Sequence, residues 1–264
     1  MIERTRGLDF FSPDQYEPQS RHVEIIGAGG IGSPLAETLA TMGFDLTIWD
    51  KDIVEAHNIS NQNYYPDQIG QRKVLALLET LTRKTKMPDE IAQFSDDNPV
   101  YKTIIQDKAN PNNKQTFTVH DEFLTHNSKL TGNILVLATD SIESRTMAYG
   151  LARDSYEYNK FPSVLIDGRL GGEEYQVFYV DMSDRQSCKA YEKTLFKPED
   201  AVDLPCTGKS IMYIASHIAG QMAYYIKEAT IKSKRVHTEC VYDFIEQTNI
   251  FNGCIVSFGD DDNE

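Results

Sequence analysis

Short apolar runs and helical repeats alternate in the first half of the chain. Residues 22–27 form an apolar run that predicts a strand, and residues 46–50 form a second one. Between them, apolar residues recur at spacings of three and four, which predicts a helix with one apolar face that ends at Gly43. The repeating residues are Ile31, Leu35, Leu39 and Met42. A strand, a crossover helix and a second strand are expected to form a right-handed parallel unit, half of a doubly wound sheet.

The same alternation continues toward the C-terminal region. A second helix is predicted between Gly70 and Pro88. Its apolar positions are Val74, Leu77, Leu78 and Leu81. Further strands are predicted at 117–120, 134–138, 164–166 and 175–180, and a long helix at 211–228. Two of these strand runs are continuously apolar, as expected for strands that helices cover on both faces. One or two closing strands are predicted within 236–257.

The remaining segments are predicted to be arms and loops around one domain. They are an N-terminal arm at 1–20, a polar surface insertion at 88–115, an irregular crossover loop at 182–208 and an acidic tail at 258–264. Neither an internal repeat nor a low-complexity linker divides the sequence, so a single domain over 1–264 is expected. The predicted fold is α/β: a Rossmann-like, doubly wound, mostly parallel sheet with closing antiparallel strands.

Composition excludes several classes of function. The net charge of −14 argues against sequence-independent binding to nucleic acid. No run approaches about 18 apolar residues, and the N-terminus lacks the apolar core of a signal peptide, so we expect a cytosolic protein that neither spans nor binds a membrane. Four cysteines are too few and too widely spaced for the disulfide framework of a secreted protein, so reduced thiols are expected.

A glycine-rich turn, Gly27-Ala28-Gly29-Gly30-Ile31-Gly32, joins the first predicted strand to the first helix. The G-x-G-x-x-G spacing lets backbone amides and the helix dipole hold phosphate. Asp50 ends the second predicted strand, where an acidic side chain accepts hydrogen bonds from ribose hydroxyls. These features indicate a nucleotide without specifying which one. An NAD(P)-dependent dehydrogenase, or a tight turn that binds no ligand, would show the same residues.

Several short motifs follow the turn in a fixed order. They are G-x-G-G-x-G-S from Gly27 to Ser33, D-x-D at Asp50 and Asp52, Asn58 and Gln62 of an N-x-x-R-Q motif, G-x-x-K at Gly70 and Lys73, and D-x-x-x-x-R at Asp140 and Arg145. In this order they resemble the MoeB/ThiF family of adenylating enzymes, to which ubiquitin-activating enzymes are related. The resemblance is carried by residues 27–145 and extends more weakly to about residue 228.

This resemblance implies a homodimeric enzyme that uses ATP and Mg²⁺ to adenylate a small ubiquitin-like or sulfur-carrier protein with a C-terminal glycine. Attack of that carboxylate on the α-phosphate needs charge neutralisation and in-line positioning more than proton transfer. By resemblance, Lys73 neutralises the phosphates and Asp140 holds Mg²⁺. The nucleotide contacts implied are Gly27, Gly29, Gly30, Gly32, Asp50, Asp52, Asn58, Gln62 and Lys73.

Some of these residues also fit ordinary structural roles when each is taken alone. Lys73 fits a solvated helix lysine, and Asp140 fits the N-cap of a helix beginning near Ser141. Arg145 is expected to orient neighbouring carboxylates rather than to bind a ligand.

The chain departs from the family pattern at Asn61, which stands where N-x-x-R-Q has arginine. One phosphate-binding cation is therefore missing. Arg72 adjoins Lys73, but its side chain is expected to leave the helix about 100° away. Relatives place an N-terminal arginine in the partner subunit's site, a role that Arg4 or Arg6 would fill here unless both are surface arginines.

The cysteines suggest one nucleophile and no structural zinc. Many relatives bind zinc through two C-x-x-C pairs, of which only Cys188 and Cys254 remain here, too few for a tetrahedral site. Cys206 lies in a P-C-T segment directly before the long helix, where a thiolate is stabilised. By resemblance it would accept the activated carrier as a thioester or in sulfur transfer; alternatively it is a small buried residue. Cys240 is expected to pack in a strand.

Two other functions are consistent with the sequence. An NAD(P)-dependent oxidoreductase would use the same glycine turn, but it leaves Asn58, Gln62, Lys73 and Asp140 unexplained. A catalytically inactive scaffold would keep the fold and bind a carrier without turnover, and Asn61 is the residue that favours this reading.

Overall fold

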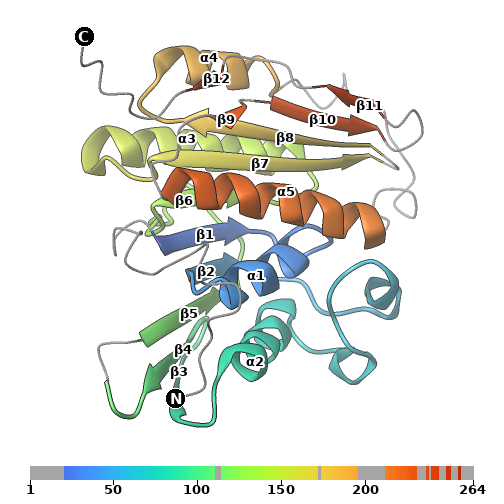
Figure 1. Ribbon diagram of the computed structural model, residues 1–264, viewed down its shortest axis with the longest axis vertical. Coiled ribbons are helices and arrows are strands. Elements are labelled where there is room, and N and C mark those ends of the chain that lie inside the picture. Colours follow the sequence, from blue (N-terminus) through green and yellow to red (C-terminus); the bar gives the residue numbers. More distant parts are fainter. Residues whose placement is uncertain are drawn as a thin grey trace.

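A ten-stranded mixed sheet forms the centre of the protein (Figure 1). The computed structural model describes residues 21–110, 114–171, 174–195 and 212–230, and the short stretches 236–237, 239–243, 248–250 and 255–256. Strand order across the sheet is β11-β10-β8-β7-β6-β1-β2-β5-β4-β3. Its parallel centre consists of β5 (Lys114–His120), β2 (Asp45–Trp49), β1 (His22–Ile26), β6 (Ile134–Leu137) and β7 (Val164–Gly171).

Antiparallel strands extend this centre on both sides. On one side lie β8 (Glu174–Asp181), β10 (Glu239–Asp243) and β11 (Thr248–Ile250), and on the other lie β4 (Val100–Asp107) and β3 (Glu90–Asp97). A separate two-stranded ladder pairs β9 (Val236–His237) with β12 (Ile255–Val256). The α/β class, the parallel centre and the closing antiparallel strands are therefore confirmed.

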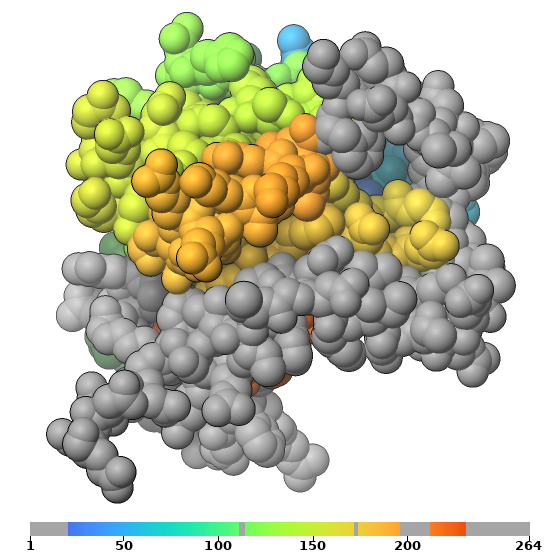
Figure 2. All heavy atoms as spheres, turned by 90° about the horizontal axis from the view of Figure 1, so that it is seen from above, coloured from blue at the N-terminus to red at the C-terminus, as the bar shows by residue number. Residues whose placement is uncertain are grey.

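Helices cover the two faces of the sheet unequally. One face packs against α1 (Gly32–Thr41), α2 (Lys73–Thr85) and α5 (Met212–Thr230), which share one apolar core with the strands. The other face packs against α3 (Ile142–Asn159) and α4 (Arg185–Glu192) through a second core. Figure 1 shows α5 in front of the sheet and α3 behind it, and Figure 2 shows the orange surface of α4 lying against the yellow-green surface that includes α3.

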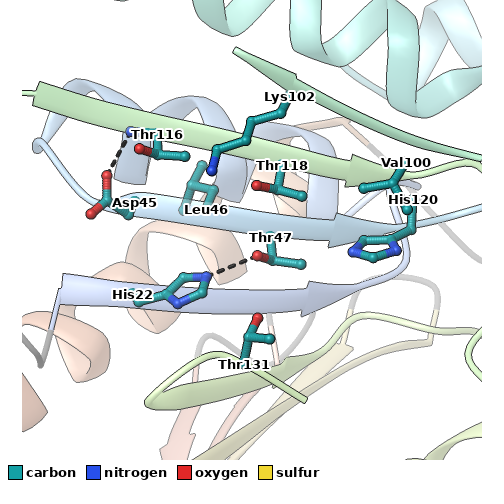
Figure 3. A pocket seen from close by; sticks show the side chains of 10 residues that line it. All are labelled: His22, Asp45, Leu46, Thr47, Val100, Lys102, Thr116, Thr118, His120 and Thr131. Atoms are coloured by element: carbon teal, nitrogen blue, oxygen red, sulfur yellow. Dashed lines mark hydrogen bonds between the residues drawn. The ribbon is translucent and has the colours of Figure 1, made fainter. Parts of the chain in front are cut away.

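Alternation along β2 explains why the second face is only partly covered. Leu46 and Ile48 are buried in the core under α1, whereas Asp45 and Thr47 point to the opposite face. There they line a groove of about 380 Å³ together with residues of β1, β4 and β5 (Figure 3). His22 and Thr47 form a hydrogen bond of 2.8 Å across this groove. On this face, β1 and β2 thus begin with the polar residues His22, Asp45 and Thr47, and end with Ile26 and Trp49, which belong to the second core.

Three segments have more regular structure than the sequence predicted. The surface insertion at 88–115 contains β3 and β4, a hairpin that extends the sheet rather than leaving it. The crossover loop at 182–208 begins with α4, and the closing region contains four short strands rather than one or two. β3 exposes nearly all of its residues, and α4 is only eight residues long with three of them buried, so neither offers the longer apolar repeat from which the other elements were predicted.

Candidate nucleotide-binding site

The glycine turn is closed by backbone contacts that only glycine allows. Gly27 has a φ of +101°, and a Cβ atom there would lie 2.6 Å from the carbonyl oxygen of Ala138. A Cβ atom on Gly32 would lie 1.9 Å from the carbonyl oxygen of Gly27. By contrast, a Cβ atom on Gly29 would have no atom within 4 Å. Gly27 and Gly32 are therefore required by the turn itself, and Gly29 marks its open side, where a phosphate can approach.

Asp50 braces this turn from the end of β2. Its Oδ2 accepts a hydrogen bond of 2.7 Å from the amide of Ala28, and its Oδ1 accepts one of 2.8 Å from the amide of Asp52. Burial raises the pKa of Asp50, while Lys73 and the two amides oppose that rise. Each carboxylate oxygen still has a lone pair for a ribose hydroxyl. Asp50, which was predicted to bind the ribose, thus also holds the glycine turn in place.

Lys73 lies at the first position of α2 and forms an ion pair with Asp52. The distance from its Nζ to Oδ2 of Asp52 is 3.0 Å, and its backbone amide donates to the carbonyl of Asp52 at 2.9 Å. The side chain of Lys73 is only 9% exposed, whereas that of Asp52 is 57% exposed. Lys73 is therefore not a solvated lysine on the helix surface. It is paired with Asp52, whose amide donates to Asp50.

The segment from Asn58 to Tyr64 is fastened onto the glycine turn. Asn58 is buried, and its Oδ1 accepts a hydrogen bond of 2.8 Å from Glu55. The Oγ atom of Ser33 accepts from the amide of Asn63 at 3.0 Å, and the hydroxyl of Tyr64 donates to the carbonyl of Ala28 at 2.7 Å. No sequence motif had pointed to Tyr64. Its pKa is well above the usual value because it is buried beside Asp50 and Asp52.

Three buried polar atoms around the turn have no hydrogen-bond partner in the described part of the chain. They are Oε1 of Gln62, Oδ1 of Asn63 and Oγ1 of Thr139. Leaving a buried polar group unbonded costs about 1–3 kcal/mol, so such groups tend to mark the position of a ligand or water. Gln62 was predicted to contact a nucleotide; Asn63 and Thr139 were not. All three atoms fit a nucleotide, whose base, ribose and phosphates offer both donors and acceptors.

Asp140 follows β6, directly after Thr139, and is exposed. It does not cap α3: Ser141 is the N-cap residue, and its side chain accepts a hydrogen bond of 3.2 Å from Ser144. The carboxylate of Asp140 is thus not used by the helix. Within the described ranges, no group of three or more His, Cys, Asp or Glu side chains could hold a metal. Mg²⁺ is commonly held by one or two carboxylates together with phosphates and water, so a single Asp140 is compatible with Mg²⁺ that arrives with a nucleotide.

Arg145 has the structural role predicted for it. Its Nε donates to Oδ1 of the fully buried Asp167 at 2.9 Å. Arg72 is also occupied, because it donates to the carbonyl of Lys51 at 2.9 Å and pairs with Asp121 at 3.2 Å. Arg72 therefore does not replace the arginine missing at Asn61.

The cysteine predictions fall largely outside the described residues. The predicted residues outside the described part of the chain are Cys206, Cys254, Arg4 and Arg6. The side chain of Cys240 is not described either. Cys188 is buried, and Arg153 donates to its Sγ at 3.2 Å. Burial raises the pKa of this thiol. Cys188 thus packs between α4 and α3, and the zinc prediction stays a prediction.

Comparison with known proteins agrees with this site. Residues 4–248 match the ThiF family. The chain belongs to the ThiF family. This assignment accounts for the ordered motifs between Gly27 and Arg145, and it favours the adenylating interpretation over the dehydrogenase one.

Curated relatives match this ThiF-family chain over short stretches. A ubiquitin-like modifier-activating enzyme 5 from Oryza sativa subsp. japonica is 38% identical over 71 residues, which is 26% of this chain and 17% of that protein. A NEDD8-activating enzyme E1 catalytic subunit from Arabidopsis thaliana is 28% identical over 138 residues, covering 52% of this chain and 25% of that protein. The matched region therefore spans a quarter or less of either relative.

Solved structures match the ThiF-family fold over most of the chain. PaaA superposes with a TM-score of 0.62 at 15% identity, covering 90% of this chain and 65% of that one. E. coli MccB with ATP gives 0.58 at 14% identity, covering 93% and 65%. E. coli tRNA N6-threonylcarbamoyladenosine dehydratase gives 0.56 at 18% identity, covering 86% and 94%. These similarities establish the fold. No helix in the described ranges is both long and apolar enough to cross a bilayer.

Proposed function

We propose that this ThiF-family protein adenylates the C-terminal carboxylate of a small ubiquitin-like or sulfur-carrier protein that ends in glycine. A carboxylate oxygen forms a bond to the α-phosphorus of ATP, and the bond from that phosphorus to the bridging oxygen of pyrophosphate breaks. The products are an acyl adenylate and pyrophosphate. Since the carboxylate is already ionised at neutral pH, no proton has to move, and catalysis depends on positioning and on neutralising charge.

The ion pair between Lys73 and Asp52 is the observation that carries this proposal. A buried ammonium beside a phosphate-binding turn is held by one half-exposed carboxylate. An ammonium has three N–H donors, so Lys73 can keep Asp52 as a partner and still donate to phosphate oxygens. The Lys73 charge also acts on Asp50, where it opposes the rise in the pKa of that carboxyl, and Asp50 accepts from the amide of Ala28 in the glycine turn. The arrangement suits a polyphosphate better than an uncharged ligand.

Asp140 and Thr139 are the residues that would meet Mg²⁺ and the phosphates. When bound, Mg²⁺ supplies positive charge that stabilises the negative charge developing on the pyrophosphate group. The exposed carboxylate of Asp140 would hold it, and the unpartnered hydroxyl of Thr139 would donate to a phosphate oxygen. Structures of similar fold have been solved with nucleotides. E. coli MccB has been solved with ATP and with AMPCPP and MccA, and E. coli tRNA N6-threonylcarbamoyladenosine dehydratase has been solved with ATP.

The cation missing at Asn61 is proposed to come from a second copy of the chain. The candidates are Arg4 and Arg6 of the N-terminal arm, which implies a homodimer. Mixing an Arg4→Ala/Arg6→Ala double variant with a Lys73→Ala variant tests this directly. Mixed dimers are expected to contain one site with both cations and to recover activity, whereas each variant alone is expected to be inactive. No recovery after verified subunit exchange would contradict the shared site.

Cys206 is proposed to take the acyl group from the adenylate as a thioester, or to act in sulfur transfer. In the first case, the thiolate sulfur forms a bond to the acyl carbon and AMP leaves. Cys206→Ala separates the steps: pyrophosphate exchange is expected to continue, while a thiol-labile adduct between enzyme and carrier disappears. An adduct that persists in Cys206→Ala would contradict this step.

Pyrophosphate exchange tests the proposed function as a whole. The enzyme, Mg²⁺, ATP and a candidate carrier ending in glycine are expected to exchange labelled pyrophosphate into ATP, and Lys73→Ala is expected to abolish the exchange. Binding of ATP and carrier without exchange would instead indicate a catalytically inactive scaffold. Two observations favour this alternative: Asn61 replaces the arginine of the family motif, and Arg72 is already bound to Lys51 and Asp121. Stabilisation by NADH rather than ATP in a thermal-shift comparison would revive the oxidoreductase alternative.

A further inference from the structure

Asp167 is a fully buried carboxylate on β7 whose two oxygens are both in use. Oδ1 accepts from Nε of Arg145 at 2.9 Å. Oδ2 accepts from Nε of Arg169 at 2.7 Å and from the hydroxyl of Tyr191 at 3.1 Å. Three elements, α3, β7 and α4, therefore meet at one carboxylate. Such charge-assisted bonds in a buried network fix the geometry of every group they join.

On one side, this network ends at the loop that carries Asp140. The guanidinium of Arg145 donates through Nη2 to the carbonyl oxygen of Thr139, and to that of Gly168 at 3.1 Å. Arg145 is 5% exposed, so these bonds are made away from water. The backbone between β6 and α3 is therefore held from below at Thr139, the residue before the exposed Asp140.

On the other side, the network ends at Thr194, just after α4. Nη1 of Arg169 donates to the carbonyl of Thr194 at 3.0 Å, and Nη2 donates to its Oγ1 at 2.9 Å. The same guanidinium lies 4.4 Å from the ring centroid of Phe178. All three nitrogens of Arg169 thus have a fixed partner. Thr194 is the beginning of the chain segment that leads toward Cys206.

We propose that Arg169, Asp167 and Arg145 form a positioning network that sets the Thr139–Asp140 loop for Mg²⁺·ATP and ties it to Thr194, just after α4. The inference rests on the proposed function, because it assigns Asp140 to the metal. None of the three residues is a catalytic residue: they act through the loop. Outer residues of this kind orient metal ligands, and their replacement lowers metal affinity by about 10–100-fold.

Conservative substitutions distinguish this role from a general contribution to folding. Arg169→Lys keeps the charge beside Asp167 but cannot reach Asp167 and both Thr194 atoms, since lysine lacks the planar fork of arginine. Thr194→Val keeps nearly the same volume and removes two hydrogen bonds of Oγ1, the one accepted from Arg169 and the one donated to the carbonyl of Tyr191. It provides a second test in case the arginine variant fails to fold. Arg153→Lys is the matched control: Arg153 also joins α3 to the α4 region, through Met182 and Cys188, without touching Asp167.

The first measurement is Mn²⁺ binding to the full chain with a non-hydrolysable ATP analogue, followed by electron paramagnetic resonance. The second is the Mg²⁺ dependence of pyrophosphate exchange, with the melting temperature as a folding control. We expect Arg169→Lys to weaken Mn²⁺ binding by about tenfold and Thr194→Val by about threefold, and Arg153→Lys to stay within about twofold. The metal concentration for half-maximal exchange should move in parallel.

The outcomes separate the two proposals. Metal affinity within about twofold of wild type in both Arg169→Lys and Thr194→Val, with normal wild-type exchange, overturns the positioning network alone. If the wild type shows no exchange but the variants still weaken the binding of metal with nucleotide, the network is supported and adenylation is overturned. A wild type that binds no metal with the nucleotide overturns both.

Discussion

Lys73 and Asp52 form an ion pair across 3.0 Å in which the cation is 9% exposed and the carboxylate 57%. The pair is therefore asymmetric: the carboxylate remains hydrated, while the ammonium depends on partners that the protein or a ligand provides. A bound polyphosphate would replace the lost hydration of the ammonium more completely than one aspartate does.

This asymmetry predicts losses of unequal size when the two partners are replaced. Lys73→Gln removes the charge that stabilises the transition state, so exchange is expected to fall by on the order of 10²–10³-fold. Asp52→Asn leaves a less restrained ammonium, so ATP binding is expected to weaken by no more than about tenfold, with the fold intact. Steady-state exchange and calorimetric ATP binding measure the two effects. Equal losses in both variants would mean that the pair acts only as a structural bridge.

The glycine turn predicts a contrast between two alanine substitutions. Gly32→Ala places a methyl group 1.9 Å from the Gly27 carbonyl oxygen, so the turn must open, and a loss of about 2–4 kcal/mol in unfolding free energy is expected. Gly29→Ala has no atom within 4 Å of the new methyl, so stability should change by less than about 1 kcal/mol. Because that methyl lies on the open side of the turn, ATP binding should still weaken.

Chemical denaturation and ATP binding measured on both glycine variants check this contrast. If Gly29→Ala binds ATP as tightly as the wild type, the phosphates do not bind at the open side of the turn.

Asp140 and Ser141 are neighbours with separable roles. Asp140→Asn is expected to weaken Mn²⁺ binding in the presence of nucleotide by about 10–100-fold without changing stability, because Ser141 caps the helix. Ser141→Ala is expected to lose about 1 kcal/mol of unfolding free energy while metal affinity changes little. Urea titration together with metal binding separates the two effects. If Asp140→Asn lowers the unfolding free energy as much as Ser141→Ala does, Asp140 contributes to capping α3.

His120 provides a pH-dependent prediction that can be followed optically. It stacks on Trp49, the single tryptophan of the chain, with 3.6 Å between ring centroids. Burial lowers the pKa of His120 from its usual value near 6.5, although Glu122 and Glu24 oppose this. The folded state therefore binds fewer protons than the unfolded state, and His120 costs stability as the pH falls from about 6.5 through the lowered folded pKa.

We expect the emission of Trp49 to change with a midpoint below pH 6.5 in the wild type. His120→Gln should lack this transition and should lose less unfolding free energy between pH 7 and pH 5. An identical fluorescence titration in His120→Gln would show that the transition does not arise from His120.

The sequence predicted the parallel centre because strands buried on both faces leave continuous apolar runs, as at Ile134–Leu137. It did not predict β3, whose residues are almost all exposed on an edge with one neighbouring strand. Nor did it predict α4, in which only Ser187, Cys188 and Tyr191 are buried. Periodicity reports burial, so elements with little buried surface leave a weak pattern.

The site shows a similar limit. Asp50 was identified by its position at the end of the second predicted strand, and Lys73 and Asp140 were identified by the resemblance of the ordered motifs to the MoeB/ThiF family. The motifs could not show that Lys73 is buried against Asp52, since 21 residues separate the two and the path between them is irregular. Tyr64 and Thr139 were missed for the same reason. Their importance follows from a hydrogen bond to Ala28 and from an unpartnered buried hydroxyl, which depend on the folded arrangement.

The β3–β4 hairpin leaves β3 as the outermost strand of the sheet, and among the described residues only β4 pairs with it. Exposed edges of this kind invite pairing with other chains, and charged residues are a common defence. Here Glu90, Asp96 and Asp97 stand at the two ends of the strand, around the exposed Phe94. Repulsion between such acidic ends would disfavour antiparallel pairing of two edges, in which Glu90 of one chain approaches Asp97 of the next. The acidic residues at the ends of β3 are thus expected to disfavour edge-to-edge association between copies of the chain.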